Sequence, residues 1–201
     1  MLYYSSYFCC ERGDKMISLF NPIQTNGLSR NEKIKNLLWV AINCTIFCWS
    51  PSRLGIFRRY RVWLTRLFGS KIDYTCSLHP SCKIEYPWNV TMGCFSSLGE
   101  KSWVYAMAPV TIGEKSCIGK DVYLLTGSHD VNSPHFTLVT RSITIGSAVW
   151  LATGCKVLPG ICISDGVVAS AASLICKDIE PWTIVGGNPA KFIKKRELKN
   201  E

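Results

Sequence analysis

The sequence predicts a mainly β chain in which short parallel strands wind into a β-helix, preceded by a helical segment. Between residues 145 and 175 an aliphatic or small apolar residue returns at every sixth position. A helix repeats every 3.6 residues and a half-buried strand every 2, so neither explains a period of six. In a parallel β-helix, one apolar side chain per short strand points into a stacked core. The residues that we expect to form this core are Ile145, Leu151, Val157, Ile163, Ala169 and Ile175.

The same period runs through earlier stretches of the chain and is interrupted between them. Its members there are Ile72, Leu78, Ile84, Val90, Leu98, Val104, Ile112, Ile118 and Leu124. The register slips by two between Val90 and Leu98 and again between Val104 and Ile112, and a much longer break follows Leu124. Insertions in a solenoid project from one face, which often carries function. The inserted loop 125–142 is therefore the first place to look for chemistry.

Length and charge limit the classes of protein. The chain has 201 residues and 47% hydrophobic content, enough for one sizeable core. Its 23 Lys+Arg against 14 Asp+Glu give a formal net charge of +9, which favours an anionic partner such as a phosphorylated cofactor or an acidic membrane. Nucleic acid is not expected, because we find no zinc-finger spacing, RNA-binding signature or basic recognition helix.

The segment before the repeat divides into two parts. Residues 1–28 are aromatic-rich with Gly and Pro breakers, and we expect them to be irregular. Residues 29–69 predict two helices, the first opened by a Ser29–Glu32 capping box and the second rich in arginine. The apolar centre of the first is too short to span a bilayer. The pair is either a cap on the open end of the solenoid or an interfacial membrane anchor whose arginines meet anionic lipid.

The eleven cysteines are expected to pack as small hydrophobes. No signal peptide opens the chain, which predicts a cytoplasmic protein with reduced thiols. A buried free Cys behaves as a small apolar side chain, so packing is favoured over catalysis or metal binding. Those on or beside interior positions of the repeat are Cys76, Cys82, Cys94, Cys117, Cys155, Cys162 and Cys176.

His129 is the candidate catalytic residue. It is one of three histidines, with His79 and His135, and it lies where the repeat breaks, among small residues that keep it accessible. A neutral imidazole there is a suitable general base for a hydroxyl group. The three histidines do not have the spacing of a zinc site, so no metal is expected.

These motifs together resemble a known family. The sixfold beat, Gly127-Ser128-His129-Asp130, the stretch 149–154 and the closing Gly186-Gly187-Asn188-Pro189-Ala190 are similar to the left-handed β-helix (hexapeptide-repeat) acyltransferases. The branch that the chain resembles most is that of WcaF-like polysaccharide O-acetyltransferases. The resemblance covers roughly residues 30 to 196. It departs after Tyr105, where Ala106 stands in place of the Asn that members of this branch often carry.

The resemblance implies roles for individual residues. His129 would deprotonate a sugar hydroxyl, which attacks the thioester of acetyl-CoA directly, and Asp130 and Tyr105 would contact the acceptor. The positions that match the co-substrate site are Trp150, Ala152, Gly154, Ala171, Ala172, Lys191 and Lys194. The small residues among them would line the pantetheine arm, and the two lysines would meet phosphates as point charges. Each has a structural alternative, namely packing, turns or a solvated helix face.

The resulting expectation is an acetyl-CoA-dependent O-acetyltransferase acting on a sugar hydroxyl in bacterial exopolysaccharide, capsule or lipopolysaccharide biosynthesis. It would be a homotrimer with sites between subunits, located in the cytoplasm, with peripheral contact at the inner face of the membrane as the further expectation. Its acceptor would be a sugar, a nucleotide-sugar or a lipid-linked saccharide. N-acetylation of an amino sugar and a non-catalytic trimeric scaffold are the alternatives. The expected parts are an irregular segment 1–28, a helical cap 29–69, a β-helix 70–180 with its insertion, and a tail with a short helix 181–201.

Overall fold

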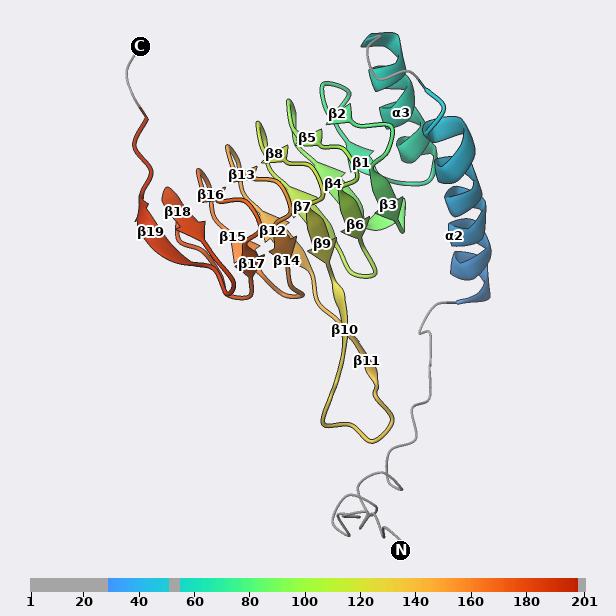
Figure 1. The fold of residues 1–201 in the computed structure, drawn as a ribbon. Coiled ribbons are helices and arrows are strands. Elements are labelled where there is room, and N and C mark those ends of the chain that lie inside the picture. The colour runs from blue at the N-terminus through green and yellow to red at the C-terminus, as the bar shows by residue number, and fades with distance from the viewer. Residues whose placement is uncertain (1–28, 51–54, 199–201) are drawn as a thin grey trace, which may run out of the picture. The chain divides into compact units, whose positions relative to one another are not determined.

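The computed structural model describes residues 29–50 and 55–198, so the predicted irregular segment 1–28 lies outside the described residues. Residues 71 to 186 wind into a left-handed parallel β-helix whose strands stack into three sheets (Figure 1). The predicted fold class is thereby confirmed. The insertion tip, residues 129–139, belongs to a compact unit separate from the β-helix.

Each of the first five coils contributes one strand to each sheet. Sheet A contains β1 (Lys71–Ile72), β4 (Val90–Met92), β7 (Val110–Ile112), β12 (Ile143–Ile145) and β15 (Cys162–Ile163). Sheet B contains β2 (Ser77–Leu78), β5 (Ser97–Leu98), β8 (Cys117–Ile118), β13 (Trp150–Leu151) and β16 (Val168–Ala169), and also β18 (Thr183–Gly186) and the antiparallel strand β19 (Lys191–Lys195). Sheet C contains β3 (Lys83–Glu85), β6 (Trp103–Tyr105), β9 (Tyr123–Leu125), β14 (Lys156–Val157) and β17 (Leu174–Ile175).

The sixfold beat marks the core. The residues that it picks out between 145 and 175 are each at most 1% exposed, so the prediction that they point inward is confirmed. They stack on equivalent residues of the neighbouring coils, as Ile145 does on Ile112 and Ile163. Because the apolar side chains fill the centre, the outward residues of the three sheets are free to form sites.

One detail of the predicted register is wrong. Ile72 pairs with Met92, and Met92 with Ile112, so the first slip of two falls between Ile84 and Met92 and not after Val90. The cause is the length of β4. A three-residue strand turns its first and third side chains to the same face, so Val90 and Met92 are both buried.

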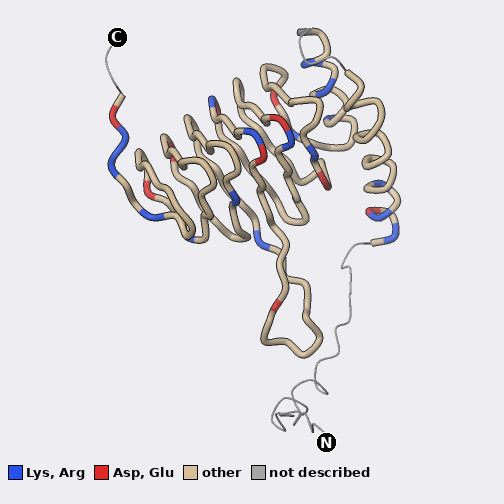
Figure 2. Tube along the Cα trace, in the orientation of Figure 1, with Lys and Arg blue, Asp and Glu red and all other residues tan. Residues whose placement is uncertain are grey.

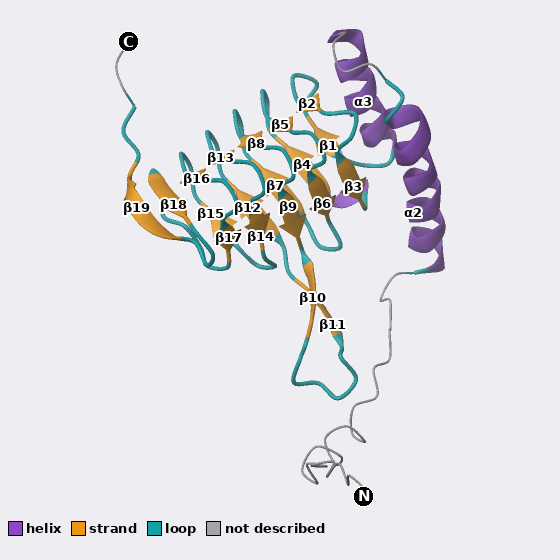
Figure 3. Cartoon of the chain, in the orientation of Figure 1, coloured by secondary structure: helices purple, strands orange, loops and turns teal. Residues whose placement is uncertain are grey.

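Two helices pack on the first coil of the β-helix (Figure 3). They are α2 (Arg30–Ile42), continued by the π-helical turn η1 (Asn43–Phe47), and α3 (Gly55–Leu67), while a short 3-10 turn, η2 (Pro87–Asn89), joins β3 to β4. The predicted capping box is present at the start of α2, with Ser29 and Glu32 bonded reciprocally. Trp39 is fully buried and donates to the Ile84 carbonyl at 2.6 Å, so the indole ties α2 to the coil.

Arg61 is not among the arginines that could meet anionic lipid, as the interpretation of the second helix as a membrane anchor would require. It is 2% exposed, and its Nε donates to the Leu78 carbonyl at 2.7 Å. Its Nη1 donates to Ser50 Oγ at 2.9 Å. Burial lowers the pKa of the guanidinium, but the group remains charged, since the ordinary value is far above neutrality. Arg61 therefore joins α3 to the first coil, while Arg58 and Arg59 are exposed.

The predicted C-terminal helix is wrong. Strand β18 turns at residues 187–190 and returns as β19, which pairs with it antiparallel. Pro189 has no backbone N–H and interrupts a helix. The segment 191–195 instead gains a partner by covering the edge of β18, so the lysines there lie on a strand and not on a helix face (Figure 2).

The seven cysteines on or beside interior positions of the repeat differ in burial, and Cys94 is partly buried. Cys76, Cys82 and Cys155 are buried, as expected for packing, and burial raises the pKa of the Cys82 thiol to about 12. Cys117, Cys162 and Cys176 are exposed, which corrects the packing role predicted for them. Cys117 and Cys162 each come one residue before an inward isoleucine, and alternate residues of a strand face opposite sides.

Candidate active site

The insertion forms a β-hairpin of β10 (Gly127–His129) and β11 (Leu138–Thr140). Its tip is closed by backbone hydrogen bonds, including Asp130 N–H to the Thr137 carbonyl at 2.8 Å and Phe136 N–H to the Ser133 carbonyl at 3.0 Å. These bonds hold the residues that follow His129 in a defined turn.

His129 is held in one tautomer by its own hairpin. Its Nδ1 lies 2.8 Å from the Phe136 carbonyl oxygen, and its ring stacks on the Phe136 ring with centroids 4.3 Å apart and planes 7° apart. A carbonyl can only accept, so the proton of a neutral imidazole is on Nδ1. Nε2 then carries the lone pair, and the side chain is exposed. This is the form that a general base requires.

Phe136 was not singled out from the sequence. Nothing in its neighbours marks it, because its contribution depends on a turn that brings residue 136 back to residue 129. It fixes the imidazole twice, by the carbonyl and by the ring face.

Asp130 has a local structural task. Its carboxylate accepts from the Asn132 N–H at 3.0 Å, a bond that shapes the turn. The side chain is nevertheless exposed, so contact with an acceptor, which the resemblance implies, stays a prediction.

Tyr105 lies on the outer face of sheet C, next to the start of the insertion. A Cβ added at Gly127 would lie 2.9 Å from Tyr105 Cε1, and the Thr126 hydroxyl donates to the Tyr105 carbonyl at 2.7 Å. The Tyr105 ring can therefore lie against this part of the chain only because Gly127 has no side chain. Burial, with the charge of Glu85 second, raises the pKa of Tyr105, so its phenol keeps the proton and can donate.

The predicted small residues lie on one corner of the coils, between sheets B and C. Gly154 and Ala172 occupy equivalent turn positions on successive coils, both with positive φ, and a Cβ at Gly154 would meet only Ala172, at 3.8 Å. Ala172 N–H donates to the Thr153 carbonyl at 2.8 Å. Ala171 is exposed, whereas Ala152 is buried. Because these residues are small, the turns form a shallow strip without bulky side chains along the last coils. We call the strip at Gly154 and Ala172 the low corner.

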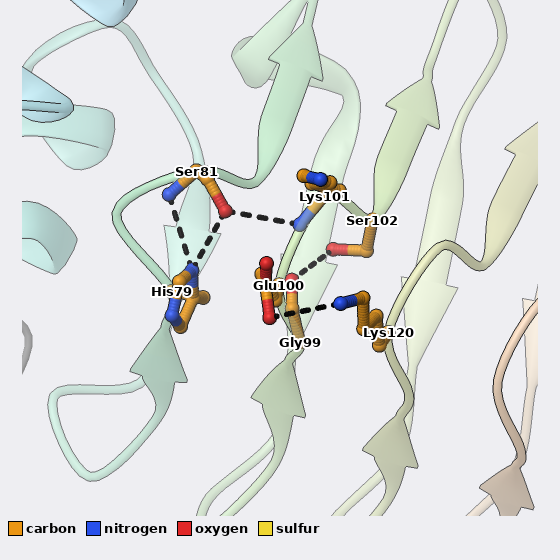
Figure 4. A network of polar contacts seen from close by, with 7 residues as sticks. All are labelled: His79, Ser81, Gly99, Glu100, Lys101, Ser102 and Lys120. Atoms are coloured by element: carbon orange, nitrogen blue, oxygen red, sulfur yellow. Dashed lines mark hydrogen bonds and ion pairs between the residues drawn. The ribbon is translucent and has the colours of Figure 1, made fainter.

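The same corner is bulkier and charged on the earlier coils. Figure 4 shows Ser81 accepting from the Lys101 N–H at 3.1 Å and Lys120 pairing with Glu100 at 3.3 Å. His79 lies here, with Nδ1 2.8 Å from Ser81 Oγ. The turn conformation does not itself require a small residue, because Lys101 adopts it with a φ of 54°. The small residues at Gly154 and Ala172 are therefore a feature of the last coils only.

Trp150 and Lys194 lie in one row across sheet B. Trp150 pairs with Val168, Val168 with Ile184 and Ile184 with Lys194. Trp150 is 50% exposed and Lys194 is exposed. Lys191 follows the hairpin turn at Ala190, whose N–H donates to the Leu174 carbonyl at 2.8 Å, two residues from Ala172. The structure therefore gathers the low corner and both lysines at the C-terminal end of the solenoid.

Arg196 has a structural role that the sequence did not indicate. Its Nη1 donates to the carbonyls of Ala148 and Gly166, at 2.7 and 2.9 Å. It thereby fastens the end of β19 to the last coils. Within residues 29–50 and 55–198, no group of three or more His, Cys, Asp or Glu side chains is placed to hold a metal ion.

The left-handed β-helix and the imidazole nitrogen available on its insertion agree with the expected class, the hexapeptide-repeat acyltransferases. No protein-family model matches the chain. It is 42% identical over 170 residues to WcaF of Escherichia coli (strain K12), named as a putative colanic acid biosynthesis acetyltransferase, and the match covers 85% of this chain and 92% of the relative. The chain therefore belongs to the family of WcaF-like hexapeptide-repeat acetyltransferases.

Solved structures agree on the fold. A maltose O-acetyltransferase from Clostridium difficile 630 superposes with a TM-score of 0.75 at 21% identity, covering 91% of this chain and 97% of that one. A hexapeptide-repeat acetyltransferase of Vibrio cholerae O1 biovar eltor, complexed with acetyl coenzyme A, gives 0.74 at 22% identity, with 91% and 99% covered.

Proposed function

We propose that the protein transfers the acetyl group of acetyl-CoA to a sugar hydroxyl during the biosynthesis of a bacterial surface polysaccharide. The observation that carries this proposal is the His129 tautomer, with Nδ1 bonded to the Phe136 carbonyl and Nε2 available. The relatives support it by name, one in colanic acid biosynthesis and another as a maltose O-acetyltransferase.

The reaction follows from that nitrogen. Acetyl-CoA supplies an acetyl group activated as a thioester. His129 Nε2 accepts the proton of the acceptor hydroxyl as its oxygen bonds to the acetyl carbon, and the resulting imidazolium returns the proton to the departing thiolate sulfur. The Phe136 carbonyl stabilises the imidazolium between these two steps, since it accepts the Nδ1 proton throughout.

The C-terminal end of the solenoid fits the shape and charge of the co-substrate. The low corner at Gly154 and Ala172 leaves room for a narrow flexible arm, which the bulkier corner at Lys101 does not. Lys191 and Lys194 are exposed cations on β19, suited to phosphate groups. Trp150 offers an exposed indole in the row of Lys194, with Val168 and Ile184 between them.

A screen of acceptors tests the function. Purified protein and acetyl-CoA are incubated with free sugars, nucleotide-sugars and lipid-linked oligosaccharides, and products are identified by mass. An added acetyl group that mild alkali removes identifies an ester, as proposed, and one that survives identifies the N-acetylation of an amino sugar. Binding of acetyl-CoA with no transfer to any acceptor would contradict the proposal.

The assembly that we propose is a homotrimer with sites between subunits, which rests on the family resemblance. Native mass spectrometry should give three times the chain mass of 22.5 kDa. A monomer that retains full activity would exclude sites shared between subunits.

The lysines of β19 give a prediction about the co-substrate. Changing Lys191 and Lys194 together to Ala should raise the Kd for CoA about tenfold at low salt, because exposed charge pairs contribute modestly and are screened. Calorimetry with CoA and dephospho-CoA measures it, and Lys101→Ala with Lys115→Ala is a matched control of two exposed lysines on solenoid turns. Equal losses for both ligands would show that the lysines do not meet the 3′-phosphate.

We further propose that the helical segment rests on an anionic membrane surface. Its solvent-facing side carries exposed apolar side chains, including Leu37 at 70%, Trp49 at 88% and Ile56 at 74%. A groove of about 520 Å³ opens between η1 and α3, lined by Thr45, Ile46, Trp49, Ser50, Phe57 and Tyr60. Among the described helices none is long and apolar enough to cross a bilayer.

The arginines of α3 favour anionic lipid. Arg58 and Arg59 are exposed, and Trp63 and Leu67 on the same helix are 46% and 61% exposed. Exposed aromatic and apolar side chains interleaved with arginines are typical of an interfacial helix. Bacterial surface polysaccharides are generally built on lipid carriers, so an acceptor of that kind would be met at such a surface.

Liposome flotation tests the membrane contact. Arg58→Glu with Arg59→Glu should lower binding to anionic vesicles at least about tenfold, since each basic residue near the surface contributes about 1 kcal/mol. Arg61 is left unchanged, because its loss would orphan buried carbonyl groups. Lys101→Glu with Lys115→Glu controls for net charge. A wild-type protein that never floats with these vesicles would leave only the packing role of the helices.

A further inference from the structure

The outer face of sheet C carries a ladder of aromatic and charged side chains that the proposed reaction does not use. In register on successive coils lie Lys83, Trp103, Tyr123 and Lys156. We call this row the sheet C ladder. Beside it run Glu85 and Tyr105, also paired in register. The sequence shows these residues at the outward positions of the beat, but only the register of the coils places them together.

The rings of the ladder are neighbours but are tilted against one another, with 77° between the planes of Trp103 and Tyr123 and 47° between those of Trp103 and Tyr105. The Lys83 ammonium group lies over the Trp103 ring, 4.9 Å from its centre. The Trp103 and Tyr123 ring centroids are 5.6 Å apart, and those of Trp103 and Tyr105 are 5.5 Å apart. All three residues are partly exposed. Neighbouring strands are spaced by about 4.8 Å, so the rings extend over two coils in one direction and across the strand in the other.

Polar groups stand at the rim of this surface. Glu85 Oε1 accepts from Trp103 Nε1 at 3.0 Å and pairs with Lys83 at 2.6 Å. Its other oxygen takes no hydrogen bond within the described part of the chain. Lys156 is exposed, with its ammonium group 5.8 Å from the Tyr123 ring centre. Rings in the middle with donors and acceptors around them match a pyranose, whose faces are C–H and whose edge is hydroxyl.

The ladder is linked to the catalytic histidine through the chain itself. It reaches Tyr105, whose ring lies against Gly127, two residues before His129 in the chain. Two lysines and a glutamate frame the rings here.

We infer that the sheet C ladder binds the sugar units adjoining the one that is acetylated, so that the acceptor is an oligosaccharide or a polymer repeat rather than a single sugar. The inference rests on the proposed function. Trp103 and Tyr123 are then specificity-determining residues.

The test compares acceptor lengths. Glucose, galactose, N-acetylglucosamine and glucuronic acid are each paired with an oligomer of four units, and transfer is measured as kcat/KM. Wild-type protein should favour at least one oligomer over its monomer by about tenfold or more, as expected for the burial of two aromatic side chains. Trp103→Ala with Tyr123→Ala should remove most of that preference while leaving kcat/KM for the monomer within about twofold. The control Phe95→Ala, an exposed aromatic on the turn between β4 of sheet A and β5 of sheet B, should keep the preference.

Binding is measured separately by saturation-transfer NMR, so that failure of the reaction and failure of the ladder are distinguishable. Length-dependent binding that the double variant loses would sustain the inference even if no acetyl transfer occurred. Equal binding of monomers and oligomers by the wild type, or no binding of any panel member, would overturn it. So would a double variant with altered oligomeric mass, since the ladder would then be a subunit contact, or one that loses melting temperature and all acceptors equally.

Discussion

Replacing His129 with Ala is expected to lower kcat for acetyl transfer by about 10²–10⁴-fold, the usual contribution of general base catalysis. The Kd for acetyl-CoA should change little, because the residues assigned to the co-substrate lie on the last coils and on β19. The reason is specific to one nitrogen. Nδ1 is committed to the Phe136 carbonyl, so only Nε2 can accept the hydroxyl proton.

The matched control is His135→Ala. His135 is an exposed histidine of the same hairpin, and its loss should leave kcat nearly unchanged. Steady-state rates with saturating acetyl-CoA, together with calorimetry for the Kd, measure both variants. Near-normal turnover in His129→Ala would remove it as the base and make His135 the candidate.

Ala172→Trp is expected to abolish productive binding of acetyl-CoA, raising its KM by about 100-fold or more. The physical reason is steric. Ala172 is exposed on the low corner, and a Cβ added to Gly154 would already lie at van der Waals distance from its backbone. An indole at position 172 would therefore fill the path assigned to the pantetheine arm. A block worth about 2.7 kcal/mol corresponds to that ratio.

The corner offers its own control. Lys101→Trp puts the same indole at the equivalent turn, with a φ of 54° against 59° at Ala172, where no co-substrate is placed. Both variants should melt within a few degrees of the wild type. If Ala172→Trp retains a normal KM, or if Lys101→Trp fails equally, the arm does not run along the last coils.

The β-helix could be predicted because its core repeats a local signal. Each inward residue such as Leu151 or Val157 is fixed by its own short strand and turn, so the period is visible in sequence. The C-terminal helix was predicted wrongly because residues 191–195 are decided by a distant partner. The open edge of β18, and not the local composition of Lys191–Lys195, makes this segment a strand.

The site was predictable where it depends on chain position and not where it depends on contacts. His129 could be chosen because it lies in the largest break of the beat, and Gly154 and Ala172 because a resemblance marked them. Phe136 could not, since only the folded hairpin places its carbonyl at Nδ1. The burial of Arg61 could not be predicted for a related reason. An arginine on an amphipathic helix can be recognised as buried only once the Leu78 carbonyl is known to face it.

The last strand also bears on solubility. β19 is the outermost strand of sheet B, and its Phe192 and Ile193 are 63% and 54% exposed. An uncovered edge with such side chains is a template for pairing with another molecule, and lysines on edge strands discourage it. The cations proposed to attract CoA phosphates therefore also keep the chain from fibrous self-association. A relative that no longer binds CoA would still need these lysines to protect its edge strand. Their presence in a relative therefore does not show that the relative is a catalyst.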